Sequence, residues 1–230
     1  MTATREKSSI NNWNLSLNKK IPLLLLLATV PLFAQEPVTH TVNFPAGDAA
    51  WTVRIQPLQK SATAPDGSPV REAELVEVVR KGNLRRDTLQ WNDGSTSQYW
   101  WNLSPAAVMF RAKPSEPIFS IRPGQLGTRR FDESNFSWVG PKTFQKMEVV
   151  GGRPLRIYRI KIEHDENVQT FTAGIDEETG LPATWSDEKA VATFKFGEPP
   201  STPLVMPEEY QSEFQRVLQN LAPVKPAGKR

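Results

Sequence analysis

Two histidines and two acidic runs are the residues whose types and spacing suggest chemistry in this sequence of 230 residues. His164 lies in the run 163–167 (EHDEN), and a histidine beside carboxylates can bind zinc or calcium. Neighbouring strand residues point to opposite sides, however, and the calcium-loop spacing with its central glycine is missing. The run therefore indicates a solvated hairpin turn. His40 follows the predicted start of the mature chain, where chain ends are usually mobile, and is not expected to be catalytic.

The second acidic run, Asp176, Glu177 and Glu178, has the residue types that glycosidases use as paired acid and base. It stands in the string IDEETGLP, where the aspartate opens a turn, Gly180 can take positive φ and Pro182 fixes the exit. A turn needs these residues without any chemistry. No G-x-S-x-G, Walker or dinucleotide motif occurs, so serine hydrolases, NTPases and dehydrogenases are unsupported and no cofactor is expected. An enzyme, if there is one, would be a carboxylate-based hydrolase.

The N-terminus has the three parts of a cleavable export signal. Lys19 and Lys20 precede 13 almost uninterrupted apolar residues at 21–33, and Ala34 follows. A membrane-spanning helix needs roughly 20 apolar residues, so the stretch is too short to span. We expect cleavage after Ala34, a periplasmic or secreted protein and no transmembrane span in the mature chain. An uncleaved amphipathic anchor is the alternative.

Removal of residues 1–34 leaves a neutral chain, because the 28 basic residues become 24 and the 25 acidic residues become 24. The net charge of +3 is therefore no sign of a nucleic-acid partner. The chain has no cysteine, which excludes disulfides, thiolate metal sites and a cysteine-linked lipid anchor. We expect a linker or first strand at 35–48, one β-rich domain at 49–221 and a disordered basic tail at 222–230.

Alternation of apolar and polar residues recurs along the mature chain and predicts antiparallel strands joined by short turns. The stretch 124–141 has no clear period and predicts a long crossing loop with one short helical turn. A helix begins after Pro207 and extends to Leu221, with acidic residues in its first turn. The predicted fold is mainly β (α+β), a curved antiparallel meander or half-barrel of about ten strands with a C-terminal helix packed on it. The strands are expected at 49–57, 71–81, 84–91, 96–103, 107–111, 118–122, 143–150, 154–163, 168–175 and 190–196.

Large aromatic residues point to both sides of the strand predicted at 96–103, since Tyr99 and Trp101 share one face and Trp100 lies on the other. One interpretation is that the main core covers one face and the C-terminal helix covers the other. The second is that a concave sheet keeps an apolar surface for a ligand, with the helix as a partial lid. The candidate ligand-binding residues are Tyr99, Trp100, Phe136 and Trp138.

Four basic residues straddle the turn between the strands predicted at 71–81 and 84–91: Arg80, Lys81, Arg85 and Arg86. We interpret them as a solvated corner, with a phosphate or lipid-headgroup role as the alternative.

Several strings of the mature chain resemble periplasmic proteins of the lipoprotein-sorting group, the LolA- and LolB-like proteins. They are VEVVRKGNLRRDTLQW, AGIDEETGLPATW, ATFKF and LVMPEEY, and the resemblance covers roughly 51–221. It implies a strongly bent, unclosed β-barrel capped by helices, with an apolar cavity that shelters acyl chains. The sequence lacks that group's long helix before the first strands, and no motif matches a single cavity residue, so no binding residue is carried over.

Together these patterns favour an exported, non-enzymatic protein that binds an apolar small molecule or the apolar part of a lipid or lipoprotein. The alternative is an envelope interaction or scaffold module without a small-molecule cavity. An enclosed concavity would favour the ligand and a flat apolar patch would favour a protein partner.

Overall fold

The computed structural model of the protein describes residues 40–59, 67, 70–111, 113, 115–164 and 167–221. The predicted signal peptide at 1–34 and the predicted tail at 222–230 lie outside these residues. Residues 40–48 form an irregular segment that leads into the first strand. The backbone N–H of Asn43 donates a hydrogen bond to the Gly180 carbonyl at 2.8 Å, which ties this segment to a turn far along the chain.

The first half of the domain is an antiparallel meander in which each strand pairs with the next. Tight turns with Gly82 (φ 57°) and Gly94 (φ 76°) join its second, third and fourth strands, and glycine suits these positive φ values because it has no Cβ. The six strands are β1 (Ala49–Pro57), β2 (Ala73–Lys81), β3 (Leu84–Trp91), β4 (Thr96–Leu103), β5 (Ala106–Phe110) and β6 (Phe119–Ile121).

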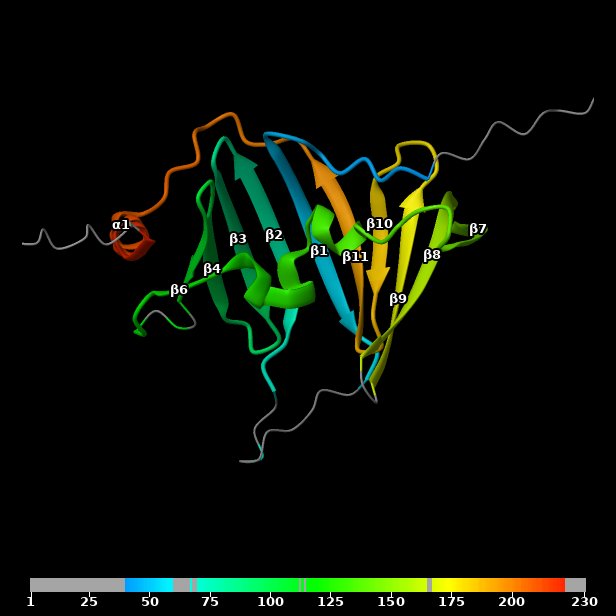
Figure 1. The fold of residues 1–230 in the computed structure, drawn as a ribbon, viewed down its shortest axis with the longest axis horizontal. Helices are drawn as coiled ribbons and strands as arrows, with labels where there is room; N and C mark the ends of the chain where they lie inside the picture. Colours follow the sequence, from blue (N-terminus) through cyan, green and yellow to red (C-terminus); the bar gives the residue numbers. More distant parts are fainter. Residues whose placement is uncertain are drawn as a thin grey trace, which may run out of the picture. The chain divides into compact units, whose positions relative to one another are not determined.

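The chain then crosses from one edge of the sheet to the other. Two 3-10 helices, η1 (Pro123–Arg130) and η2 (Glu133–Phe136), occupy the crossing segment and lie in front of the sheet in Figure 1. The return strands are β7 (Phe144–Val150), β8 (Arg153–His164), β9 (Asn167–Asp176), β10 (Pro182–Ser186) and β11 (Ala190–Gly197). The sheet order is β6-β5-β4-β3-β2-β1-β11-β10-β9-β8-β7, so among the described strands β6 and β7 form the two edges and the sheet is open.

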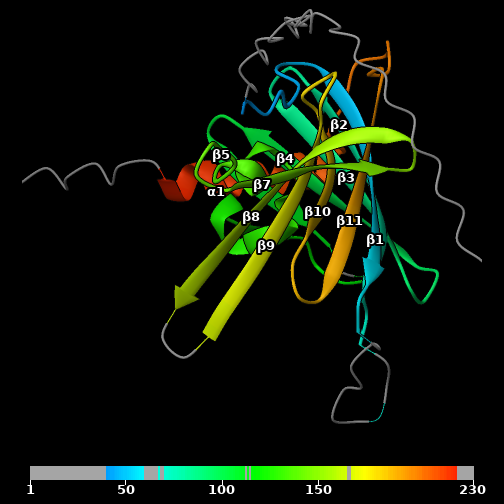
Figure 2. The ribbon, with the colours of Figure 1, turned by 90° about the vertical axis from the view of Figure 1, so that its right-hand side faces the viewer.

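Strand β10 is not among the predicted strands, and the sheet has eleven strands where about ten are expected. Strand β10 has 5 residues and begins at Pro182, which the sequence pattern assigned to the preceding turn. Its pairing with β9 also shifts between Pro182 and Thr184, which breaks the alternation that identifies a strand. Because β10 ends at Ser186 opposite Thr172, the first residues of β9 extend beyond it, and β8 and β9 continue as a long hairpin (Figure 2).

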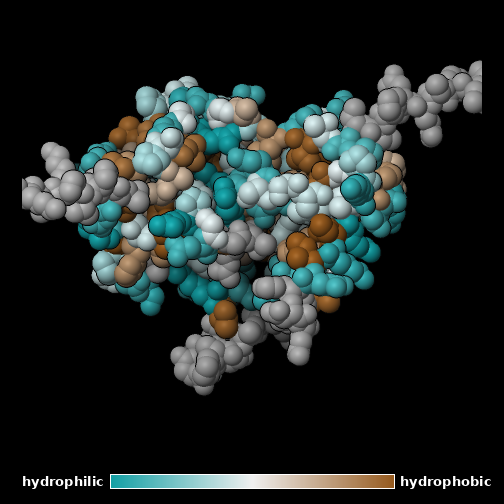
Figure 3. Space-filling view, in the orientation of Figure 1, coloured by the Kyte–Doolittle hydropathy of each residue, from teal (hydrophilic) through white to brown (hydrophobic). Residues whose placement is uncertain are grey.

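One face of the sheet is concave and holds the main hydrophobic core. Residues of β3 and β9 meet in this core although four strands lie between them in the sheet order. The crossing segment adds Phe131 and Phe136 to the same core. Burial of these side chains is the dominant stabilising term, at about 25 cal/mol per Å² of apolar surface. In the space-filling view of this face, hydrophobic residues form separate patches among hydrophilic ones (Figure 3).

Helix α1 (Glu208–Leu221) packs on the opposite, convex face against β5 and β6. Its residue Tyr210 joins Met206, Trp100 and Met109 in a second hydrophobic cluster. The predicted fold class is confirmed: the protein is mainly β, with an open, curved antiparallel sheet and a C-terminal helix. The idea of α1 as a partial lid over the concave face is wrong, because Trp100 beneath it alternates with the inward residues Tyr99 and Trp101.

Candidate functional site

A cavity of about 440 Å³ lies at one end of the concave face, beside the crossing segment. It is bounded by the last residues of β1 and β3, the first residues of β2 and β11, and the part of β9 that extends beyond β10. Strand β10 contributes Trp185 to the lining, and β4 contributes Tyr99. The crossing segment contributes Phe131 and occupies the space further along the concave face.

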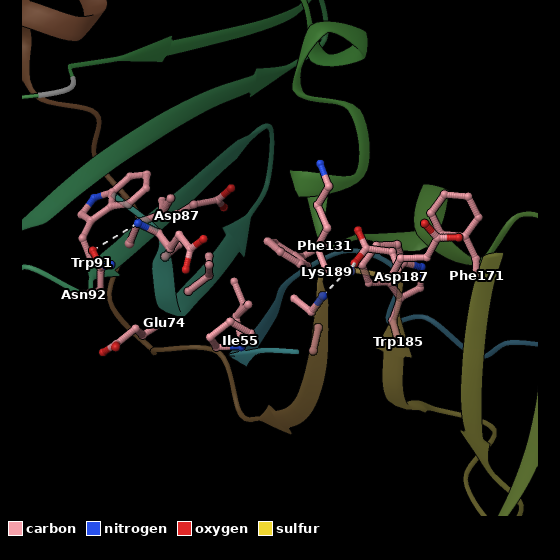
Figure 4. Close-up of a pocket in the computed structure, with 18 of the residues that line it drawn as sticks. Ile55, Glu74, Asp87, Trp91, Asn92, Phe131, Phe171, Trp185, Asp187 and Lys189 are labelled. Atoms are coloured by element: carbon pink, nitrogen blue, oxygen red, sulfur yellow. Dashed lines mark hydrogen bonds between the residues drawn. The ribbon is translucent and has the colours of Figure 1, made fainter. Parts of the chain in front are cut away.

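The walls of the cavity are mainly apolar and aromatic. Figure 4 shows Trp91 on one side and Phe171 and Trp185 on the other, with Ile55 and Phe131 between them. The rings of Phe171 and Trp185 lie 5.7 Å apart and form one continuous aromatic wall. Further apolar lining comes from Ala73, Val76, Leu89, Tyr99, Ala190 and Ala192. Such a surface suits the apolar part of a ligand.

Charged residues gather where the cavity meets solvent. Glu72 immediately precedes β2 and Glu74 lies in its first residues, and Asp187, Glu188 and Lys189 form the turn between β10 and β11. The carboxylate of Asp187 accepts the backbone N–H groups of Lys189 and Ala190, both at 2.8 Å, which fixes this turn (Figure 4). We call Glu72, Glu74 and 187–189 the mouth of the cavity.

A buried ionic cluster of Arg85, Asp87 and Asp132 lies next to the cavity, and Asp87 lines it. Arg85 and Asp87 are each 3% exposed. Arg85 donates to the two carboxylate oxygens of Asp87 at 2.6 and 2.9 Å and to Asp132 at 3.0 Å. The indole N–H of Trp101 donates to Asp87 at 2.8 Å, and the Arg85 guanidinium lies 4.3 Å from the Trp101 ring centre. The charges are thus hydrogen-bonded as well as paired, as buried charges must be.

The pKa values of the two carboxylates in this cluster are shifted in opposite directions. Burial raises the pKa of Asp87 above the ordinary aspartate value, although Arg85 and Trp101 act against this. Burial also tends to raise the pKa of Asp132, but Arg85, Ser134 and Arg130 outweigh it, so the pKa of Asp132 lies below the ordinary value. Asp132 is therefore the securely ionised partner of Arg85.

The same cluster anchors the crossing segment to the sheet. Arg85 on β3 binds both the Asp132 side chain and the Arg130 carbonyl, and the Trp51 indole N–H donates to the Phe131 carbonyl at 3.0 Å. Phe131 takes φ 48° and ψ 42°, a left-handed conformation that is unusual for a side chain of this size. Its backbone is held in place by contacts on both sides, and its ring forms part of the cavity wall.

The predicted ligand-binding residues divide between the two faces. Tyr99 lines the cavity. Phe136 is buried in the concave core with its ring 5.4 Å from that of Phe194, and Trp138 is half-buried against the same core. Trp100 is 2% exposed and lies under α1, where its ring centre is 6.3 Å from that of Tyr210. Ligand contact by Tyr99, Phe136 and Trp138 stays a prediction, whereas Trp100 could contact a ligand only on the convex face, away from this cavity.

Two parts of the site did not follow from the sequence. Arg85 was assigned to a solvated corner, and this is wrong because its side chain points into the concave core with Asp87. The alternation Arg85, Asp87, Leu89 along β3 was the available signal, since it places Arg85 on the apolar face. Trp185 was missed together with β10, because the strand was not recognised.

His40 and Asp176 make contacts within the fold. His40 Nδ1 lies 3.2 Å from the Tyr158 hydroxyl. The Asp176 carboxylate accepts the Thr179 backbone N–H at 2.9 Å, which lowers the Asp176 pKa and confirms the predicted turn. The side chain of His164 lies outside the described residues. Among the residues that the structure describes, no group of three or more histidine or acidic side chains could hold a metal ion.

No helix within the described ranges is long and apolar enough to cross a membrane. No known protein-family profile matches the chain, and no curated protein matches it. Among solved structures, the chain is similar to the crystal structure of the lipoprotein LppX of Mycobacterium tuberculosis, with 11% sequence identity and a TM-score of 0.40. The similarity covers 69% of this chain and 89% of that chain. A likeness this low carries no argument about function, so the resemblance to the LolA- and LolB-like group stays a prediction.

Proposed function

We propose that this protein is an exported, non-enzymatic binding protein that holds an apolar small molecule, or the apolar part of a lipid or lipoprotein, in the cavity of its concave sheet. The observation that carries the proposal is the cavity itself, about 440 Å³ with apolar and aromatic walls. Pockets for small ligands commonly measure about 300 to 1,000 Å³ and are lined mostly by such side chains.

The energetic basis is the transfer of apolar surface from water to this cavity. Each methylene group that a ligand buries contributes about 0.8 kcal/mol, which corresponds to roughly four-fold in affinity. A volume of about 440 Å³ equals that of about fifteen water molecules, so a chain of several methylenes fits. We expect affinity to rise with chain length until the cavity is filled.

A fluorescence titration of residues 35–230 with the neutral apolar dye N-phenylnaphthylamine tests this proposal. The dye should give a saturable increase in emission. Ala73→Phe should weaken binding at least about ten-fold, since the added ring fills space that Ala73 lines. The matched control is Ala106→Phe, which adds the same ring at an exposed position of β5 away from the cavity. An unsaturable signal, or equal loss in both variants, would contradict binding in the cavity.

A second candidate, docking of another envelope protein, is favoured by the free edge strand β7. Val149 is 71% exposed there, and Met147 and Val150 are also exposed. An edge strand can pair with a strand of another chain. Val149→Lys would separate the two functions, because it should weaken a partner complex and leave dye binding unchanged.

A further inference from the structure

We infer that the ligand of the cavity is a cationic amphiphile, with its apolar chain against the aromatic walls and a positively charged group at the mouth. This inference rests on the proposed function, because it names the chemical class of ligand that the same cavity takes. The cavity is the binding site, and the charges at its mouth determine the sign of the charge that the ligand's headgroup carries.

The described residues of the mouth carry four carboxylates, Glu72, Glu74, Asp187 and Glu188, and one amine, Lys189, which gives these five residues a formal charge of minus three. Glu74 and Glu188 are exposed, whereas Glu72 and Asp187 are half-buried. The mature chain as a whole is neutral by sequence, so this concentration of acidic groups is local. The remaining lining carboxylate, Asp87, lies deeper and is paired with Arg85.

Arg71, which precedes Glu72 in the sequence, is also positively charged, but its guanidinium makes contacts outside the cavity. Its guanidinium lies 4.2 Å from the centre of the Trp91 ring, 3.3 Å from the Asp93 carboxylate and 2.6 Å from the Ser95 hydroxyl. The Asp93 charge compensates that of Arg71 locally. Arg71 therefore makes a cation–π contact with one face of the Trp91 ring, and that face is not available to a ligand.

Further aromatic side chains lie below the mouth. Tyr99, Phe171 and Trp185 line the cavity within the same enclosure as the carboxylates. Ammonium groups are attracted to aromatic faces by the ring quadrupole, and carboxylates stabilise them further. An anionic headgroup would meet both the aromatic faces and the negative mouth unfavourably. Low-dielectric walls strengthen these interactions compared with an open surface.

A direct test compares three ligands with the same chain and different headgroups: decylammonium, decanol and decanoate. Each is titrated by calorimetry into residues 35–230 at pH 7, below its micelle-forming concentration. We expect decylammonium to bind about ten-fold more tightly than decanoate, the ratio that a few exposed charge contacts produce. The preference should shrink as ionic strength rises from about 0.01 M to about 1 M, where the Debye length falls from about 30 Å to about 3 Å.

Glu74→Gln with Glu188→Gln removes two charges at exposed positions of the mouth and keeps the size of both side chains. This double variant should lose most of the preference for decylammonium over decanoate and keep its affinity for decanol. The matched control, Glu77→Gln with Glu178→Gln, removes the same charge at exposed positions that do not line the cavity, and should behave like the wild type.

The outcomes separate the two proposals. If none of the three ligands binds, the proposed function itself fails. If decanol binds and decanoate equals or exceeds decylammonium, the cavity function stands and the charge assignment is overturned. A preference for decylammonium that survives in the Glu74 and Glu188 variant, or disappears equally in the control, would also overturn the assignment to the mouth.

Discussion

Replacement of Arg85 by methionine should destabilise the protein strongly, because it leaves Asp87 buried without its cation and leaves Asp132 with only the partly exposed Arg130. Arg85 makes hydrogen bonds of 2.6 to 3.0 Å to these carboxylates while only 3% exposed, and it also binds the Arg130 carbonyl. Removal of one partner from a buried ion pair costs about 3–5 kcal/mol. With a urea m-value of about 2 kcal/mol/M, the unfolding midpoint should fall by about 2 M.

The loss of unfolding free energy caused by Arg85→Met should increase with pH. Without the guanidinium, the folded-state pKa values of Asp87 and Asp132 rise. A group whose folded pKa exceeds its unfolded pKa contributes stability below the unfolded value, and this contribution is lost as pH rises through the folded pKa. The difference in unfolding free energy between wild type and variant should therefore be largest near pH 7 and shrink toward pH 4.

Urea unfolding followed by tryptophan fluorescence measures both effects. The control is a triple variant, Arg85→Met with Asp87→Asn and Asp132→Asn, which also removes the two buried charges that Arg85 pairs with and keeps acceptor oxygens for Trp101 and Ser134. It should recover at least about half of the lost free energy. A loss below about 1 kcal/mol for Arg85→Met, or a triple variant no more stable than the single one, would refute the role of Arg85 as the anchor of the crossing segment.

Three further predictions concern the ionic cluster, the convex face and the N-terminus. Asp132→Asn should cost about 1–3 kcal/mol at pH 7 in urea unfolding. Because the folded pKa of Asp132 is lowered, its contribution is present above the unfolded pKa and lost as pH falls through the folded value, so the cost should vanish in acid; an unchanged cost there would contradict the lowered pKa. Trp100→Ala should lower the unfolding free energy by about 3–5 kcal/mol yet leave dye affinity per folded molecule unchanged, since Trp100 lies under α1; a parallel loss of affinity would place the ligand on the convex face. Expression with residues 1–34 in a bacterial host should give a mature protein that begins at Gln35, whereas N-terminal sequencing that returns the intact chain would indicate a retained anchor.

Regular alternation made most of the sheet predictable. The strands predicted at 84–91 and 96–103 coincide with β3 and β4, because the turns at Gly82 and Gly94 mark both ends of β3 and the start of β4. Helix α1 was predicted to within one residue, since Pro207 and two glutamates define its first turn. The strand β10 escaped prediction because it is short and irregular beside β9.

The candidate site was less predictable, because it depends on contacts between distant segments. Nothing in the local pattern around Arg85 shows that Asp132, 47 residues later, lies against it. The side on which α1 packs is likewise a tertiary property, and it decides that Trp100 faces the helix while Tyr99 faces the cavity. Periodicity shows which residues share a face of a strand but not which face becomes concave.

The most direct test of ligand binding in the cavity is the set of indole N–H signals in two-dimensional NMR spectra of residues 35–230, which contain six tryptophans. Titration with decanol should shift the signals of Trp91 and Trp185, which line the cavity, and leave that of Trp100 under α1 in place. A shift at Trp100 with Trp91 and Trp185 unmoved, or no saturable shift at any tryptophan, would contradict ligand binding in the concave face.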